Sequence, residues 1–121
     1  GRDDDIPSFE HVSDGKVVMR MDIGKHHIRP GGYVSGPTQM ALADHAAYSV
    51  IFTRTGIVPM AVTSNLNIDF LRPCIGSELM AEAKLIKFGK HLAVVSVDIR
   101  AEQSEKLSSR ATVTYVVPIV K

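Results

Sequence analysis

A long stretch with almost no polar face, from His26 to Gly56, limits the possible folds of this chain more than any other feature. After a turn-rich beginning, Ser35-Gly36-Pro37 is a typical helix start, and no helix breaker follows until Gly56. The pattern predicts one helix of about five turns. Apolar residues are spread around its surface: Met40, Ala41, Leu42, Ala43, Ala46, Ala47, Tyr48, Val50, Ile51 and Phe52. A surface helix would show a clear polar face, so we expect other structure to cover this one on most sides.

One carboxylate, Asp44, interrupts this apolar helix. An unpaired carboxylate in a dry site is costly, so it is normally either paired or used in chemistry. Two hypotheses follow. Asp44 is a catalytic acid, or it is a structural acid that is hydrogen-bonded to Asn65, to Asn67 or to a neighbouring chain.

The composition bounds the class of protein. With 121 residues and 45% hydrophobic content, the chain suits one domain over residues 1–121. Fourteen basic residues against thirteen acidic ones leave a formal charge of +1 without a basic run, which argues against nucleic acid as a partner. The single cysteine, Cys74, excludes an internal disulfide and fits a reducing cytoplasm. We expect no cofactor, no metal and no membrane segment, since no apolar run approaches about 18 residues.

Most of the remaining chain alternates between apolar and polar residues with the period of a half-buried strand. Five segments have this pattern: Lys16–Ile23, Met60–Leu71, Glu78–Lys87, Leu92–Glu102 and Leu107–Val120. The residue types of the third segment also permit a helix, but its alternation and flanking turns favour a strand. Residues 1–15 are acidic and contain Pro7, and we expect an extended or frayed entry there.

The segment Met60–Leu71 has two contrasting faces. Its apolar side is predicted to carry Val62, Ser64, Leu66, Ile68 and Phe70, and its polar side Thr63, Asn65, Asn67 and Asp69. One helix cannot cover both faces of a sheet built from such strands. We therefore predict an α+β fold in which a curved antiparallel sheet of five to six strands wraps around one long central helix.

Four motifs, in this order, give the chain a resemblance to a known family over Lys16–Val117. They are Gly31-Gly32-Tyr33-Val34-Ser35-Gly36-Pro37, Leu42-Ala43-Asp44, Ala61 to Pro73 (AVTSNLNIDFLRP) and Lys87-Phe88-Gly89-Lys90. In these the chain resembles the PaaI-like acyl-CoA thioesterases of the hotdog superfamily. The resemblance implies the hotdog fold and hydrolysis of an acyl-coenzyme A.

The resemblance also implies roles for individual residues. Asp44 would be the catalytic carboxylate, as general base or nucleophile, and the Gly36 N–H would face the thioester carbonyl. Thr63 or Ser64 would help to hold the attacking water. We assign further residues to substrate binding: Arg29, Ser35, Asn65, Asn67, Arg72, Lys87 and Lys90.

The chain departs from the family pattern at three of the motif positions. Ser35 replaces the usual histidine, Arg29 with His27 nearby replaces an upstream asparagine, and Pro37 replaces the second glycine. Ser35 suits a helix entry better than a nucleophile, because no histidine and acid are placed to form a triad with it. His26, His27 and His45 are expected at the surface or in a dimer contact, with the site lining as the alternative for His27.

The spacing of the two central residues has a consequence for assembly. Gly36 and Asp44 are eight positions apart, which is about 12 Å along a helix. Both cannot contact one carbonyl carbon from the same helix. If both act, Gly36 of one chain must meet Asp44 of another, so the mechanism requires a dimer. The resembled family is dimeric and often a dimer of dimers, that is, a homotetramer.

Charged residues suggest how coenzyme A would be recognised. Arg72, Lys87 and Lys90 fall at turns, where exposed cations could bind its phosphates. The alternative is that these cations, like Lys84 and Arg110, are only solvated charges.

Three functional hypotheses remain, in this order. The first is an acyl-CoA thioesterase. The second is a non-catalytic acyl-CoA binder, which the departures at Ser35 and Arg29 favour. The third is a hotdog hydratase or dehydratase. The last usually needs a paired histidine and acid, and Asp44 and His45 are helix neighbours that do not face one site.

Overall fold

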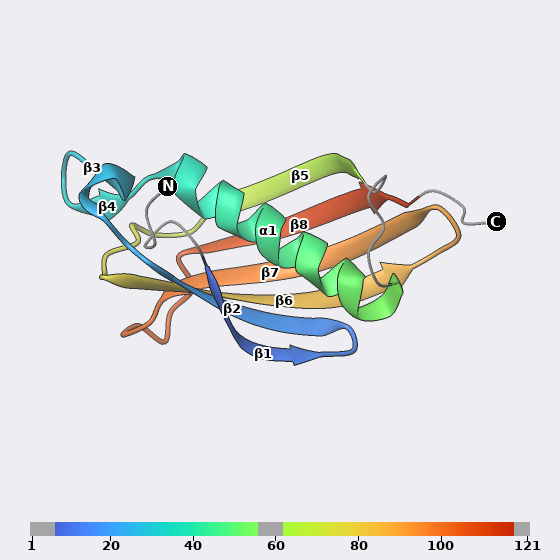
Figure 1. The fold of residues 1–121 in the computed structure, drawn as a ribbon. Coiled ribbons are helices and arrows are strands. Elements are labelled where there is room, and N and C mark those ends of the chain that lie inside the picture. The colour runs from blue at the N-terminus through green and yellow to red at the C-terminus, as the bar shows by residue number, and fades with distance from the viewer. Residues whose placement is uncertain (1–6, 56–61, 118–121) are drawn as a thin grey trace.

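The computed structural model describes residues 7–55 and 62–117, in which one long helix lies across the concave face of a curved sheet (Figure 1). The helix is α1 (Gly36–Thr55). The sheet contains β1 (Ser8–Ser13), β2 (Lys16–Asp22), β5 (Val62–Phe70), β6 (Glu78–Phe88), β7 (Leu92–Ala101) and β8 (Ser109–Val116). Its order is β1-β2-β6-β7-β8-β5 and every pairing is antiparallel. The predicted hotdog arrangement is confirmed.

Several sequence expectations fall outside the described residues. These are the helix end at Gly56, the first residues of the strand predicted over Met60–Leu71, and the end of the last predicted strand near Pro118. Within residues 7–55 and 62–117, no helix has the length and apolar character needed to cross a membrane.

The N-terminal segment is more ordered than its composition indicates. Residues 8–13 form β1, which pairs with β2 through a turn at Gly15, where φ is +78°. All six side chains of β1 are exposed, and the register shifts between Phe9 and His11. A strand with no buried face and an interrupted register shows no apolar alternation, which is why the sequence predicted only an extended entry.

Small residues let the helix approach the sheet closely. Ala43, Ala46 and Ala47 of α1 are fully buried, and alanines also occupy buried positions of the strands beneath: Ala81, Ala83, Ala93 and Ala111. Larger side chains fill the space on either side, among them Met19, Leu42, Ile51, Leu79 and Ile99. The strand alternation predicted for β2, β6 and β7 is confirmed, since Val17, Met19 and Met21 face the core, as do their counterparts in the other two strands.

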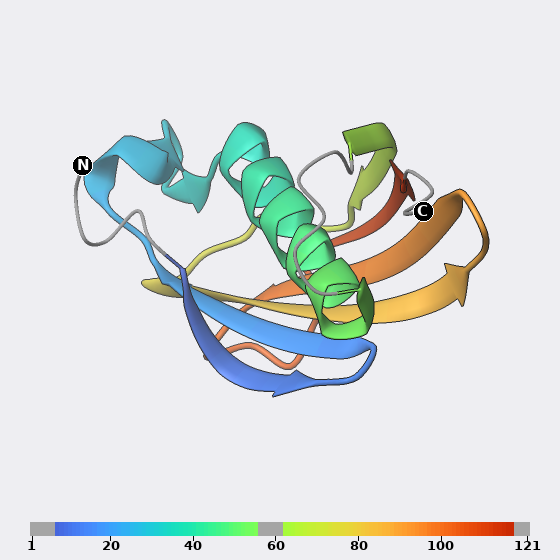
Figure 2. The ribbon, with the colours of Figure 1, turned by 45° about the vertical axis from the view of Figure 1, so that its right-hand side comes forward.

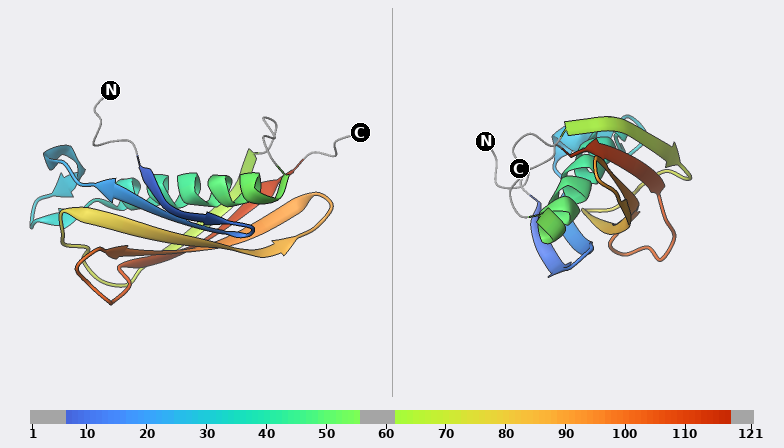
Figure 3. Two further views of the ribbon diagram at one scale, coloured as in Figure 1. Left: turned by 60° about the horizontal axis from the view of Figure 1, so that its bottom comes forward. Right: turned by 90° about the vertical axis from the view of Figure 1, so that its right-hand side faces the viewer.

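The sheet curls around α1 but leaves one side of the helix open (Figures 2 and 3). Met40 and Phe52 are 39% and 37% exposed, and Ala41 and His45 are also exposed. The prediction that other structure covers the helix on most sides therefore agrees with the structure, and this strip is the side that one chain leaves open. An uncovered apolar strip on a central helix is typical of a surface that meets another chain.

Candidate active site

A small hairpin directly precedes the helix. After a short 3-10 turn (Lys25–His27), β3 (Ile28–Arg29) pairs with β4 (Tyr33–Val34), and the connecting Gly31 and Gly32 have φ values of +105° and +82°. Only glycine adopts such values without strain, so Gly31-Gly32 is a turn requirement here.

Ser35 caps the helix, as the sequence predicted for a helix-entry residue. Its Oγ accepts a hydrogen bond from the Thr38 N–H at 3.3 Å and lies 2.6 Å from Thr38 Oγ1. Its own N–H donates to the His27 carbonyl at 2.8 Å. With its hydroxyl engaged in capping and only 8% exposed, Ser35 has no geometry for nucleophilic attack.

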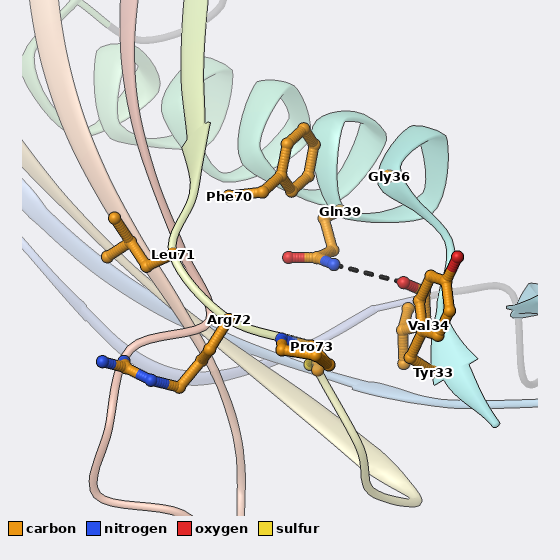
Figure 4. Close-up of a pocket in the computed structure, with 9 residues that line it drawn as sticks. Tyr33, Val34, Gly36, Gln39, Phe70, Leu71, Arg72 and Pro73 are labelled. Atoms are coloured by element: carbon orange, nitrogen blue, oxygen red, sulfur yellow. Dashed lines mark hydrogen bonds between the residues drawn. The ribbon is translucent and has the colours of Figure 1, made fainter. Parts of the chain in front are cut away.

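The first pocket lies at the helix N-terminus and is called the N-terminal pocket below (Figure 4). It has a volume of about 400 Å³ and is lined by Tyr33, Val34, Gly36, Gln39, Phe70, Leu71, Arg72, Pro73 and Cys74. Among the described residues, none accepts a hydrogen bond from the Gly36 N–H. A free N–H at the positive end of a helix dipole is suited to an oxygen that carries negative charge.

Two polar side chains of this pocket are already engaged. Gln39 is 3% exposed, donates from Nε2 to the Val34 carbonyl at 3.3 Å and accepts from Ser109 Oγ at 2.7 Å. Burial raises the pKa of the Cys74 thiol, so this cysteine stays protonated and is a poor nucleophile. The N-terminal pocket therefore offers a carbonyl-binding donor but no activated base.

The second pocket surrounds Asp44 and is called the Asp44 pocket. It measures about 450 Å³ and is lined by Ala41, Asp44, His45, Tyr48, Thr63 and Tyr115. Asp44 is half-buried and not isolated. Its Oδ1 accepts hydrogen bonds from Thr63 Oγ1 at 2.8 Å and from the Tyr115 hydroxyl at 2.6 Å. The hypothesis that Asn65 or Asn67 pairs with Asp44 is therefore wrong.

A β-bulge aims Thr63 at the helix. Thr63 pairs with Tyr115 and Asn65 pairs with Thr114, so Ser64 is an extra residue without its own partner. The bulge shifts the alternation by one position and places Thr63 on the same side of β5 as Leu66. The predicted assignment of Thr63 to the polar face is therefore corrected: strict alternation holds from Asn65 onward but fails across Ser64.

The other predicted residues of β5 face away from Asp44. Asn67 Nδ2 donates to Asn65 Oδ1 at 2.7 Å on the outer surface of the sheet, and Ser64 is exposed. Arg29 is exposed in the small hairpin. The structure thus joins Thr63 to Asp44 and leaves Ser64, Asn65, Asn67 and Arg29 outside both pockets of this chain.

The cations expected to bind coenzyme A do not gather within one chain. Arg72 follows the end of β5 that pairs with Ser109, and its guanidinium donates to the Leu107 carbonyl. Figure 4 shows it pointing away from Gly36. Lys87 and Lys90 lie at the β6–β7 hairpin, at the opposite end of the sheet. Of the cations thought to be only solvated, Lys84 pairs with Glu82 at 3.1 Å and Arg110 with Asp98 at 2.7 Å.

The histidines differ in their surroundings. His26 and His45 are exposed, as expected. His27 is only 8% exposed, and its Nδ1 accepts the Gly24 N–H at 2.9 Å, so its placement at the surface is wrong. It does not line either pocket described above. No group of three potential metal ligands occurs in the part of the chain that the structure describes.

Sequence reasoning missed Tyr115. It is the last inward-facing residue of β8, after Ser109, Ala111 and Val113, and it is 2% exposed. A buried tyrosine hydroxyl needs a partner, which was a usable signal. The sequence does not identify that partner, because only the order of strands in the sheet places β8 beside β5, whose Thr63 faces Asp44.

Comparison with known proteins decides between the functional hypotheses. The family model of the thioesterase superfamily matches residues 31–108, which contain both pockets apart from Tyr115. The chain belongs to the thioesterase superfamily. It is accordingly a thioester hydrolase, which agrees with the reaction of the first hypothesis.

Individual relatives agree with this assignment. A protein of known structure from Silicibacter sp. TM1040 is 37% identical, with 93% of this chain and 78% of that chain covered and a TM-score of 0.85. Thioesterase superfamily member 2 of zebra fish is 25% identical over 93% of this chain and 81% of its own, with a TM-score of 0.83. Human acyl-coenzyme A thioesterase 13 is 28% identical over 95 residues, which cover 77% of this chain and 66% of the human protein.

The PaaI protein of E. coli has the same fold as this chain. It is 23% identical, with 91% of this chain and 82% of the PaaI chain covered and a TM-score of 0.81. At this identity the comparison concerns the fold alone. It agrees with the predicted PaaI-like architecture of this thioesterase.

Proposed function

We propose that this thioesterase hydrolyses an acyl-coenzyme A in a site that two copies of the chain build together. The observation that supports this most is the separation of the two chemical parts. The N-terminal pocket has the free Gly36 N–H, and the Asp44 pocket has the carboxylate. Eight helix positions, about 12 Å, lie between them.

The chemistry assigns one role to each part. Asp44 takes a proton from water, whose oxygen attacks the thioester carbonyl carbon, and the Gly36 N–H stabilises the negative charge on the carbonyl oxygen. The carbon–sulfur bond then breaks, and the thiolate of coenzyme A leaves with the proton that Asp44 had taken. Attack by the Asp44 carboxylate itself, followed by hydrolysis of the anhydride, gives the same products.

Pairing of two chains along the edge strand β5 would join the two parts. In the described part of the chain β5 pairs only with β8, so its other side has free backbone donors and acceptors. Gly36 lies beside Phe70 at one end of β5, and Asp44 is bonded to Thr63 near the other end. If β5 pairs antiparallel with its symmetry mate, the Thr63 end of one strand lies beside the Phe70 end of the other. Asp44 of one chain then approaches Gly36 of its partner.

The same symmetry would bring the cations together. Arg72 of the partner would come to the end of the sheet that carries Lys87 and Lys90, where the three could bind the phosphates of one coenzyme A. The name of human acyl-coenzyme A thioesterase 13 supports this substrate class.

The test is thiol release from acetyl-, hexanoyl-, dodecanoyl- and benzoyl-coenzyme A by the wild-type protein and by Asp44→Asn. We expect Asp44→Asn to lose nearly all hydrolysis while it still binds a non-hydrolysable thioether analogue. Asp69→Asn is the matched control, because Asp69 is an exposed carboxylate on β5, opposite Arg110 of β8 in the strand register and away from Asp44. If Asp44→Asn retains most of the wild-type kcat, Asp44 is a structural acid and the mechanism is wrong.

A further inference from the structure

We propose that Tyr115 is a positioning residue for hydrolysis, which with Thr63 holds Asp44 by one oxygen and leaves the other to react. This inference rests on the proposed role of Asp44 and assigns a residue that the family motifs of the chain do not contain. It is carried by the geometry around the carboxylate.

Both donors converge on a single oxygen atom. The Tyr115 hydroxyl lies 2.6 Å from Asp44 Oδ1 and 2.9 Å from the Asp44 carbonyl oxygen, and Thr63 Oγ1 lies 2.8 Å from the same Oδ1. The one hydroxyl hydrogen of Tyr115 has its better acceptor in Oδ1, which is nearer and charged. Among the described residues, Oδ2 accepts no hydrogen bond, and it belongs to the carboxylate that lines the open Asp44 pocket.

The tyrosine itself is held firmly. Tyr115 is 2% exposed, and its ring centroid lies 5.7 Å from that of Tyr48, which in turn packs edge-on against Phe52 at 4.5 Å. Tyr115 is on β8 and Thr63 is its cross-strand partner on β5, so two neighbouring strands present the two hydroxyls together. A fixed pair of donors restricts the carboxylate to one orientation, which lowers the cost of reaching the reactive geometry.

The protonation state of Tyr115 suits this role. Burial, followed by the hydrogen bond to the Asp44 carboxylate, raises the pKa of the Tyr115 phenol above its ordinary value. The hydroxyl therefore remains a donor throughout the neutral range. Oδ2 is left as the atom that takes the proton from water or attacks the carbonyl carbon, since both lone-pair directions of Oδ1 are used.

A structural role alone would make different predictions, so the test uses Tyr115→Phe, which keeps the ring and removes the donor. Thr63→Val removes the second donor. Thr114→Val is the matched control, because Thr114 neighbours Tyr115 on β8 but faces the outer surface. For each variant we would measure kcat, KM and the pH profile on the thioester that the wild type hydrolyses fastest. The ¹³C chemical shift of the Asp44 carboxyl group, which reports its hydrogen bonds, would be measured in parallel.

We expect Tyr115→Phe to lower kcat about ten- to a hundredfold, the effect of one hydrogen bond to a charged group, with KM changed by less than about twofold. Because the lost donor contacts the carboxylate directly, the ¹³C chemical shift of the Asp44 carboxyl group should change, and the pH profile should differ from that of the wild type. Thr63→Val should act in the same direction, and Thr114→Val should resemble the wild type.

Two results separate this inference from the proposed function. A wild-type kcat or an unchanged ¹³C chemical shift of the Asp44 carboxyl group in Tyr115→Phe would overturn the role of Tyr115 and leave Asp44 in place. A wild-type protein that hydrolyses none of the thioesters would overturn the proposed function, while the ¹³C chemical shift would still show whether Tyr115 binds the carboxylate.

Discussion

The ring of Phe70 lies directly over Gly36: a Cβ atom added at Gly36 would stand 3.2 Å from Phe70 Cζ. The first residue of α1 and the last residue of β5 are thus in close contact, and both line the N-terminal pocket. Glycine at this position lets the aromatic ring approach the helix N-terminus closely. The contact makes the pocket sensitive to a single methyl group.

Gly36→Ala should therefore reduce activity without unfolding the protein. Alanine keeps the N–H and is a good helix residue, but its Cβ must push the Phe70 ring by a few tenths of an ångström toward the substrate. We expect kcat/KM to fall about tenfold with an almost unchanged Tm. Gly36→Ala combined with Phe70→Leu should recover part of the loss, because leucine leaves room for the methyl group. If Gly36→Ala has wild-type kinetics, the carbonyl does not bind at this pocket.

The proposed pairing of β5 with its mate predicts how charge on this strand changes the oligomeric state. Asn65→Asp with Asn67→Asp places four like charges near the two-fold axis of the dimer. We expect a dimer or tetramer for the wild type and mainly monomer for this variant in sedimentation at micromolar concentration.

The control for that experiment is at the opposite edge of the sheet. Ser8→Asp with Ser13→Asp adds the same charge to exposed positions of β1 and should leave the oligomer intact. A wild-type monomer with full activity would contradict the shared site.

Coenzyme A recognition should depend on ionic strength. We expect Arg72→Ala, Lys87→Ala and Lys90→Ala together to raise KM up to about tenfold at low salt and to flatten its salt dependence, since exposed cation–phosphate contacts are screened. Lys84→Ala is the control, because this cation is paired with Glu82 on the outer face of the sheet. An unchanged KM in the triple variant would remove these cations from the site.

The sequence was sufficient for the central helix and the sheet that surrounds it, because both follow from local patterns. Ser35 begins the helix as its side chain predicts, and the alternation of β2, β6 and β7 matches their buried faces. β1 was not recognised as a strand because it buries no side chain. Local patterns thus fail where an element has no buried face of its own.

The site was less accessible to sequence reasoning. Thr63 was placed on the wrong face because one extra residue, Ser64, shifts the alternation, and a bulge has no distinct residue pattern here. Tyr115 was missed because it is 71 positions from Asp44, and their contact depends on the order of strands in the sheet. Arg72 and Lys87 appeared as equivalent turn residues, although the sheet separates them within one chain.

The central claim is that one catalytic site combines Gly36 of one chain with Asp44 of another, and mixed dimers test it most directly. Gly36→Pro removes the N–H at a helix position that tolerates proline, whereas Gly36→Ala keeps the N–H and controls for crowding of Phe70. Dimers that combine Gly36→Pro with Asp44→Asn, each carrying a different affinity tag, would be co-expressed and purified by both tags.

Each parent homodimer should be nearly inactive, because every one of its sites has one defect. In the mixed dimer both defects collect in one site, and the other site receives Gly36 from the Asp44→Asn chain and Asp44 from the Gly36→Pro chain. We predict that its kcat returns to as much as about half of the wild-type value per dimer. Purified mixed dimers that remain as inactive as their parents would contradict the shared site.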